Sequence, residues 1–267
     1  MDLFKQGLAP IASEAWDEIN ETAVDVLETT LSARKVLHVD GPYALSTTAV
    51  SNGTLKLLNT PKDEVVKSGL YDVQPLLESR VTFSLSRWEL DNVLRGKKDV
   101  ELDALEEAAE ALARYEDDAV YNGNKDAKIR GLVNLAPHKL SMSDDPNETL
   151  QAIAEGILKL EDGYVGKPFT LVVGDDVFKM INKVYDGKLL IDAIEKLIEG
   201  DVVHSKVLKG ALLLPYNHED LELTIGQDYT IGYDSHDAET VTLFMMNAFT
   251  FRVHDENLIV YFKYYQK

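Results

Sequence analysis

The stretch LDALEEAAEALARYEDDAVYNG, from Leu102 to Gly123, predicts the long helix around which the fold is organised. Its apolar residues recur three or four positions apart, which places them on one helix face, while most of its acidic residues fall on the other. Gly123 lies just past the last periodic residue, where a left-handed C-cap is expected. The apolar positions are Leu102, Leu105, Ala108, Ala109, Leu112, Tyr115, Ala119 and Val120.

Three consecutive acids near the end of this helix, Glu116, Asp117 and Asp118, could be metal ligands or structural residues. Adjacent side chains diverge by about 100° around a helix and cannot converge on one ion unaided. No Glu-x-x-His pair of the di-iron kind occurs in the chain. Acids at a helix C-terminus also oppose its dipole. We therefore expect groups outside the helix to compensate them.

The segments before this helix predict a second helix and a projecting arm. Apolar residues recur at helical spacing from Trp16 to Leu31, so a helix over about 13–34 is expected, with Ser13 as its cap. Gly41-Pro42 then forces a turn. Residues 54–57 and 80–85 alternate as strands do, with a long polar connection between them. Such an arm cannot bury its own faces, which implies a partner.

The segments after the helix predict a mixed α/β unit over about 129–218 and a β-rich end. Asp145-Pro146 precedes a helix, 169–173 and 211–214 are apolar enough to be buried strands, and Asp175-Asp176 are expected to cap another helix. LTIGQDYTIGY, VTLFMMNAFTFRV and LIVYFKYY are rich in strand-forming residues. The fold class expected is α+β.

Composition and charge limit the possible functions. The 267 residues are 45% hydrophobic, with 27 Lys+Arg against 46 Asp+Glu and a formal net charge of -19, which disfavours nucleic acid as a partner. Without cysteine there is no disulfide framework, and no apolar run reaches the length of a membrane span. We expect a soluble intracellular chain without a membrane partner. No nucleophile, phosphate-binding or metalloprotease motif is present, so the prediction is an assembly subunit and not an enzyme.

Three segments carry a resemblance to a known family, with matching order and spacing over essentially the whole chain: LSARKVLHVDGPY, VTFSLSRWELDNVLRGKKDVELDALEEAAEALARYEDDAVYNG, and IGQDYTIGY followed by FTFRV. The chain resembles the encapsulin shell proteins. The resemblance implies an HK97 phage capsid-like fold with a P-domain (1–48, 86–130 and 226–267), an extended E-loop (49–85) and an A-domain (131–225).

The family resemblance also implies a function. Its members build closed icosahedral nanocompartments in the cytoplasm of bacteria or archaea. These shells enclose ferritin-like proteins or dye-decolourising peroxidases that carry C-terminal targeting peptides. The chain length favours the smallest shell, a homo-oligomer of sixty copies. No cofactor is required, and iron would enter only through the cargo. The alternatives are an HK97-type phage major capsid protein, which would hold DNA, and a soluble hydrolase.

Candidate sites follow from the same resemblance. A cargo-tag groove maps onto Leu27, Leu31, Arg34, Val36 and His38, with Ile231 and Tyr233 opposite. The pore loop at the fivefold axis maps onto YDGKLL, that is Tyr185, Asp186, Gly187, Lys188, Leu189 and Leu190. Some members bind a flavin on a Trp located where Trp88 stands, although Trp88 would serve equally well to anchor a helix entry. No catalytic or metal-ligating residue is predicted.

Overall fold

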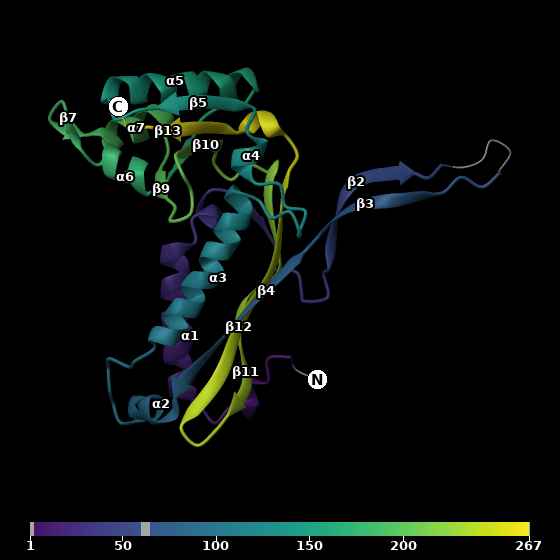
Figure 1. Ribbon diagram of the computed structural model, residues 1–267, viewed down its shortest axis with the longest axis vertical. Helices are drawn as coiled ribbons and strands as arrows, with labels where there is room; N and C mark the ends of the chain where they lie inside the picture. The colour runs from purple at the N-terminus through teal and green to yellow at the C-terminus, as the bar shows by residue number, and fades with distance from the viewer. Residues whose placement is uncertain (1–2, 60–64, 267) are drawn as a thin grey trace.

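The computed structural model describes residues 3–59 and 65–266. Two β-sheets with their helices lie at opposite ends of an elongated body, and a two-stranded arm extends sideways from it (Figure 1). None of the helices in these ranges is long and apolar enough to cross a membrane.

The first sheet has four strands in the order β1-β11-β12-β4, with β1 parallel to β11 and the other pairs antiparallel. The strands are β1 (His38–Asp40), β11 (Leu221–His236), β12 (Thr240–Val253) and β4 (Leu77–Ser86). The helices beside this sheet are α1 (Ser13–Thr30), α2 (Arg87–Leu94) and α3 (Asp103–Tyr121) (Figure 1). Helix α3 contacts both α1 and the sheet, as expected of a helix with one apolar face.

The second sheet has five strands in the order β5-β13-β10-β6-β9, which mixes parallel and antiparallel pairs. The strands are β5 (His138–Met142), β13 (Val260–Tyr264), β10 (Ala211–Pro215), β6 (Phe169–Val173) and β9 (Val202–His204). Every residue of β6 and β10 is buried, which explains their uninterrupted apolar sequences. The helices of this region are α4 (Leu132–Leu135), α5 (Pro146–Asp162), α6 (Asp175–Ile181) and α7 (Leu190–Ile198).

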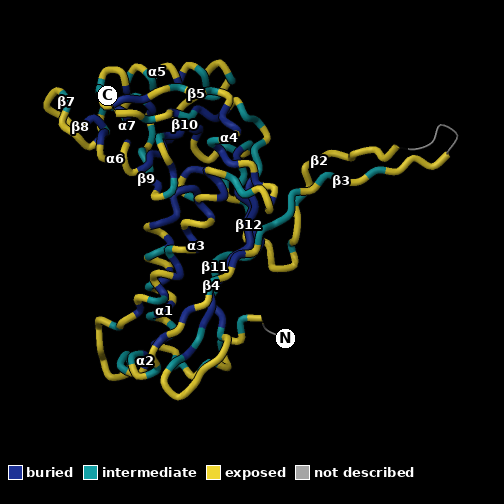
Figure 2. The backbone as a smooth tube through the Cα atoms, in the orientation of Figure 1, coloured by how far each residue is buried: buried dark blue, intermediate teal, exposed yellow. Residues whose placement is uncertain are grey.

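The arm consists of β2 (Ala49–Leu57) and β3 (Gly69–Pro75), paired antiparallel. The prediction was wrong about its second strand. Residues 80–85 belong to β4, which pairs with β12 in the body, and the strand that returns along the arm is β3. Residues 60–64, at the far end of the predicted E-loop, lie outside the described ranges. Most of the arm is exposed, as Figure 2 shows.

The helix ends agree only partly with the expected caps. Gly123 follows α3 with φ +90°, which confirms the expected left-handed residue there. The side chain of Asp145 accepts a hydrogen bond from the Glu148 N–H and so caps α5. Two expectations were wrong. Ser13 is the first residue of α1 and not its cap, and α6 is preceded by Gly174 with no side-chain cap.

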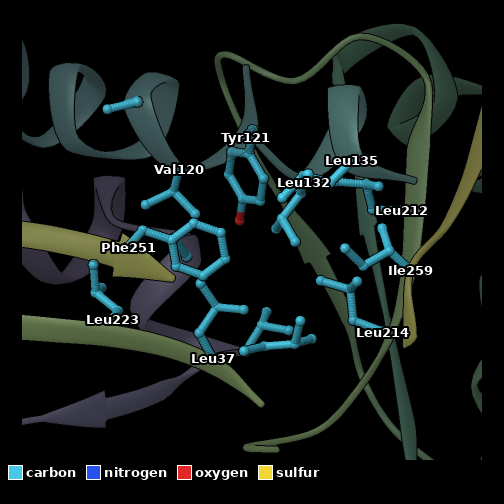
Figure 3. Packing of buried hydrophobic residues seen from close by; sticks show 14 of the residues in the cluster. Leu37, Val120, Tyr121, Leu132, Leu135, Leu212, Leu214, Leu223, Phe251 and Ile259 are labelled. Atoms are coloured by element: carbon cyan, nitrogen blue, oxygen red, sulfur yellow. The ribbon is translucent and has the colours of Figure 1, made fainter. Parts of the chain in front are cut away.

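Three clusters of buried side chains form the core. One lies between α1, α3 and the four-stranded sheet, and another fills the five-stranded sheet and its helices. The third joins the two ends of the body, where Tyr121 at the end of α3 meets Leu132, Leu135 and Phe251 (Figure 3). Both α3 and β12 contribute to the first and the third cluster, so the two ends of the body share a continuous interior.

Sheet membership differs from the predicted division of the chain in two places. Strand β11 begins at Leu221, before the predicted boundary at 226. Strand β13, which the prediction groups with the P-domain, lies between β5 and β10 in the sheet of the predicted A-domain. The remaining small elements are η1 (Gln6–Leu8), η2 (Ala33–Lys35), η3 (Glu256–Leu258) and the hairpin β7 (Val184–Tyr185) with β8 (Lys188–Leu189).

Candidate functional site

A pocket of about 520 Å³ opens where α1 ends against β11. Leu27, Leu31 and Arg34 of the predicted cargo groove line it. Leu27 and Leu31 lie one turn apart on the same face, so α1 presents an apolar wall with Arg34 at its end. The other lining residues are Val24, Glu28, Lys35, Asp228 and Tyr229.

The other predicted groove residues do not line this pocket. Ile231 is only 4% exposed and belongs to the same apolar cluster as Leu27 and Leu31. Val36 is buried in the cluster that joins the two ends of the body. The remaining two are held elsewhere: the Nδ1 of His38 lies 3.2 Å from the Asn217 side-chain oxygen, and the Tyr233 hydroxyl lies 2.6 Å from His236 Nδ1.

Five lining residues were missed by sequence reasoning: Val24, Glu28, Lys35, Asp228 and Tyr229. Val24 precedes Leu27 and Leu31 by three and seven positions, so helical spacing could have placed it on the same face. Asp228 and Tyr229 lie in the IGQDYTIGY segment, where a register shift of β11 between Gln227 and Thr230 spans both residues. A strict alternation of inward and outward side chains therefore fails there.

A buried ionic network forms the floor of this region. The fully buried carboxylate of Glu116 accepts hydrogen bonds from Arg34 Nε at 2.6 Å and Nη2 at 2.9 Å, from the Tyr229 hydroxyl at 3.0 Å and from Asn247 Nδ2 at 2.9 Å. Arg34 Nη1 also donates to Asp228 at 2.7 Å, and the guanidinium carbon lies 4.8 Å from the centre of the Tyr229 ring. Although burial acts to lower the pKa of Arg34, its bond to Glu116 raises it, so Arg34 stays charged.

Asp117 binds the start of the 3₁₀ turn that follows α1. Its two carboxylate oxygens accept from the Ser32 N–H (2.9 Å), the Ser32 hydroxyl (2.6 Å) and the Ala33 N–H (3.0 Å). Burial raises the pKa of Asp117 from 3.8 to about 6, partly opposed by these bonds. The Tyr121 hydroxyl lies 3.0 Å from the same Ser32 oxygen. These contacts confirm that groups outside α3 compensate its acids.

The third acid of the run also has a structural partner. Asp118 accepts a hydrogen bond at 2.7 Å from the Asn122 side chain, in the turn that ends α3. Across residues 3–59 and 65–266, no group of three or more His, Asp or Glu side chains is arranged to hold a metal ion. The acidic run is therefore part of the architecture.

The predicted pore residues form the small hairpin β7–β8, which projects from the five-stranded end of the body (Figure 1). Asp186 and Gly187 have φ of 47° and 78°, as expected in a two-residue turn with both central residues left-handed. The Tyr185 hydroxyl donates to Asn147 at 2.5 Å and ties the hairpin to α5. Leu190 differs from the others, since it begins α7 and is 1% exposed.

Trp88 lies in the first turn of α2 with 67% of its surface exposed. The Arg95 guanidinium carbon is 5.9 Å from the centre of the indole ring. A flavin needs a flat apolar face for its ring system and cations for its phosphate. The pair of Trp88 and Arg95 fits both needs, and it also fits a simple cation–π contact on the surface.

Comparison with known proteins identifies the family. Residues 1–250 match the Linocin_M18 family model, described as encapsulating protein for peroxidase. The chain is 34% identical over 253 residues to the type 1 encapsulin shell protein of Mycolicibacterium paratuberculosis, covering 94% of this chain and 95% of the relative. It is 35% identical over 260 residues to the type 1 encapsulin shell protein of Rhodospirillum rubrum, covering 94% of this chain and 93% of that relative.

Solved structures agree on the fold. A virus-like particle from Pyrococcus furiosus superposes with a TM-score of 0.69 at 17% identity, covering 93% of this chain and 99% of that one. The capsid of Myoviridae phage XM1 superposes with a TM-score of 0.56 at 14% identity, covering 85% of this chain and 90% of the phage chain. Similarity at this level of identity shows a shared HK97-type fold alone. The family match, together with this fold, shows that the chain belongs to the type 1 encapsulin shell proteins and is a structural shell protein, not an enzyme.

Proposed function

We propose that this chain assembles into a closed icosahedral cage of sixty copies that encloses a tagged cargo enzyme. The observation that carries the proposal is the arm formed by β2 and β3. Its large apolar side chains are exposed in a single chain, with Leu57 at 71%, Leu70 at 63% and Tyr71 at 78%. Apolar patches and unpaired strand edges of this kind are stabilised when a second subunit covers them.

Expression of the chain alone tests the assembly. Hollow particles of uniform size are expected, and cryo-electron microscopy counts the copies from the symmetry. Monomers or open rings at neutral pH would refute the cage. Closed shells of a larger class would refute the sixty-copy size and leave the cage intact.

Removal of the arm tests its role as a clasp between subunits. Deletion of residues 52–69, which include the undescribed 60–64, leaves both sheets of the body intact. It removes most of β2, including Leu57, so the arm can pair only at residues 49–51 and 73–75. The variant should give folded subunits by circular dichroism but no closed shells by electron microscopy. Particles of normal size and yield would show that the arm is not the clasp.

The pocket beside α1 is proposed as the cargo-tag site. A short tag that is disordered before binding needs a few apolar anchors to offset its ordering cost, and Leu27 and Leu31 supply them. Arg34 stands at the end of this wall, where it can bind a tag carboxylate or carbonyl oxygen. The family description names a peroxidase, so a peroxidase with a C-terminal targeting peptide is the first cargo to test, and a ferritin-like protein the second.

A substitution that introduces a negative charge into the pocket should reduce the amount of cargo in the shells. Leu31→Asp puts an unpaired carboxylate at a site only 6% exposed, and Val24→Asp does so at the 49% exposed rim with less risk to folding. Leu158→Asp, at an exposed position of α5, is the matched control. The cargo-to-shell ratio after co-expression should fall several-fold for the first two variants only. Normal loading of assembled Val24→Asp and Leu31→Asp shells would place the groove elsewhere.

Two further roles belong to the same proposal. The β7–β8 hairpin would line the fivefold pore, so Lys188→Glu should alter the entry rate of charged small substrates. Trp88 with Arg95 would hold a flavin, which purified shells would show as flavin absorbance lost in Trp88→Ala. Colourless wild-type shells after growth with excess riboflavin would refute the flavin. The shell itself would lie in the cytoplasm, with no nucleic acid and no membrane as partner.

A further inference from the structure

A second pocket, of about 290 Å³, lies where the arm joins the body. We call it the arm-root pocket. Its lining includes Lys128, Arg130, Arg252 and His254, and none of the described residues that line it is acidic. This contrasts with the chain as a whole, in which 46 acidic residues outnumber 27 Lys and Arg. A concave cluster of cations in so acidic a protein is a site where negative charge is expected to bind.

Arg252 keeps one donor without a hydrogen-bond partner among the described residues. Arg252 donates from Nη2 to Glu222 and from Nη1 to the Ser51 carbonyl oxygen at 2.5 Å, but its buried Nε has no hydrogen-bond partner among the described residues. An unpaired N–H on a buried guanidinium costs free energy that an acceptor would recover. Lys128 makes no ion pair in the described part of the chain, whereas Arg130 is paired with Glu256 at 2.8 Å.

The backbone also holds Lys128 in an unusual conformation. Its φ is 59°, in the left-handed region where glycine would be free of strain. The loop is tied on both sides, since the N–H and carbonyl groups of Asn124 and Ile129 pair with each other. Lys128 lines the same pocket as Arg130 and Arg252, so its backbone conformation is part of how the pocket is built.

From these observations we infer that the arm-root pocket binds a small multivalent oxyanion of the phosphate class. A tetrahedral dianion offers acceptors in several directions, which matches cationic donors that come from two separate segments of the chain, 128–130 and 252–254. A divalent cation is disfavoured because the described lining offers no carboxylate. The pocket is compact, so it suits an ion and not a polymer.

The arm-root pocket lies between the arm and the body, so an ion bound there would affect how the two are joined. Asn52 and Gln74 of the arm line the pocket together with the cations of the body. An ion bound between them would connect the two parts and restrict the angle of the arm. Any effect of the ion on shell assembly rests on the proposed cage function, whereas binding of the ion to the pocket does not.

Calorimetric titration with inorganic phosphate at pH 7, against sodium chloride of equal ionic strength, tests the site. We expect saturable binding of one phosphate per chain, weakened at least tenfold in the double variant Lys128→Gln with Arg130→Gln. The matched control removes two exposed lysines that make no ion pair in the described ranges, Lys139→Gln with Lys179→Gln, and should bind within twofold of wild type. Assembly of the wild-type chain should also respond to phosphate more than to chloride.

Two results would overturn the inference. The first is the absence of saturable phosphate binding to the wild-type chain. An equal loss of phosphate binding in the control variant would have the same force, because it would show that net charge, and not this pocket, determines the affinity. The second is phosphate binding to dissociated subunits but not to closed shells. That result would assign the pocket to a carboxylate of a neighbouring copy and not to a free ion.

Discussion

Replacing Glu116 by Gln isolates the contribution of the buried network to stability. In the wild type, four donors from Arg34, Tyr229 and Asn247 converge on the two carboxylate oxygens, and the Glu116 side chain is 0% exposed. The amide has only one acceptor atom. At least one guanidinium N–H must then face the amide N–H₂, and Arg34 loses its closest negative charge.

The magnitude follows from the burial of the pair. Breaking a buried ion pair by removing one partner costs about 3–5 kcal/mol, and Asp228 still partly neutralises Arg34, so we expect a loss of about 3 kcal/mol. At roughly 2–4 °C per kcal/mol for a chain of this size, the midpoint of thermal unfolding should fall by roughly 6–12 °C.

The same helix supplies a matched control. Glu110 also pairs with two cations, Lys206 at 2.6 Å and Arg114 at 2.8 Å, but its side chain is 35% exposed. Because solvent screens such pairs, Glu110→Gln should cost less than about 1 kcal/mol. Both variants are compared by circular dichroism at equal protein concentration, assembly state and scan rate, since the midpoint depends on all three. A Glu116→Gln shift no larger than that of Glu110→Gln would refute the importance of the buried pair.

Two further predictions concern burial and packing. Burial raises the pKa of Asp117 from 3.8 to about 6, so between these values the folded chain binds a proton that the unfolded chain lacks. The free energy of unfolding of wild type relative to Asp117→Asn should therefore increase by about 2 kcal/mol as pH falls from 7 to 4, and a difference independent of pH in chemical denaturation would contradict this expectation. In Gly232→Ala the new Cβ would lie 2.2 Å from Cζ of the buried Phe244 ring, which should cost about 1–3 kcal/mol in the same assay, whereas Gly166→Ala has no atom within 4 Å and should change little; equal effects would contradict the packing argument.

The spine helix and its acids could be predicted because local rules determine them. The apolar period of α3 predicted its extent and its buried face, except for Tyr115, which is 43% exposed. The unfavourable place of Glu116 and Asp117 near a helix C-terminus implied partners outside the helix. The identity of those partners could not be read from the sequence. Arg34 and Ser32 precede Glu116 and Asp117 by more than eighty positions, and only the fold brings them together.

The arm shows where sequence patterns fail. In β3, residues 69–75, burial does not alternate, because the arm has no core of its own and its exposed apolar residues do not mark an inner face. Strand β4 does alternate, because β12 and α3 give it one buried side. Sequence reasoning therefore found β4 and assigned it to the arm. In the proposed groove, the uneven register of β11 breaks the alternation of inward and outward side chains, so Asp228 and Tyr229 were missed.

The place of β13 in the five-stranded sheet has a consequence for biosynthesis. This strand, at Val260–Tyr264, lies between β5 and β10 and is the only link between them in the described sheet. Domains fold as units while the ribosome synthesises the chain, but this sheet stays split until residue 264 has emerged. A stalled or truncated product lacks the strand that unites the sheet and exposes the edges of β5 and of the apolar strand β10. A subunit that stops before Val260 should therefore fail to join the two halves of this sheet.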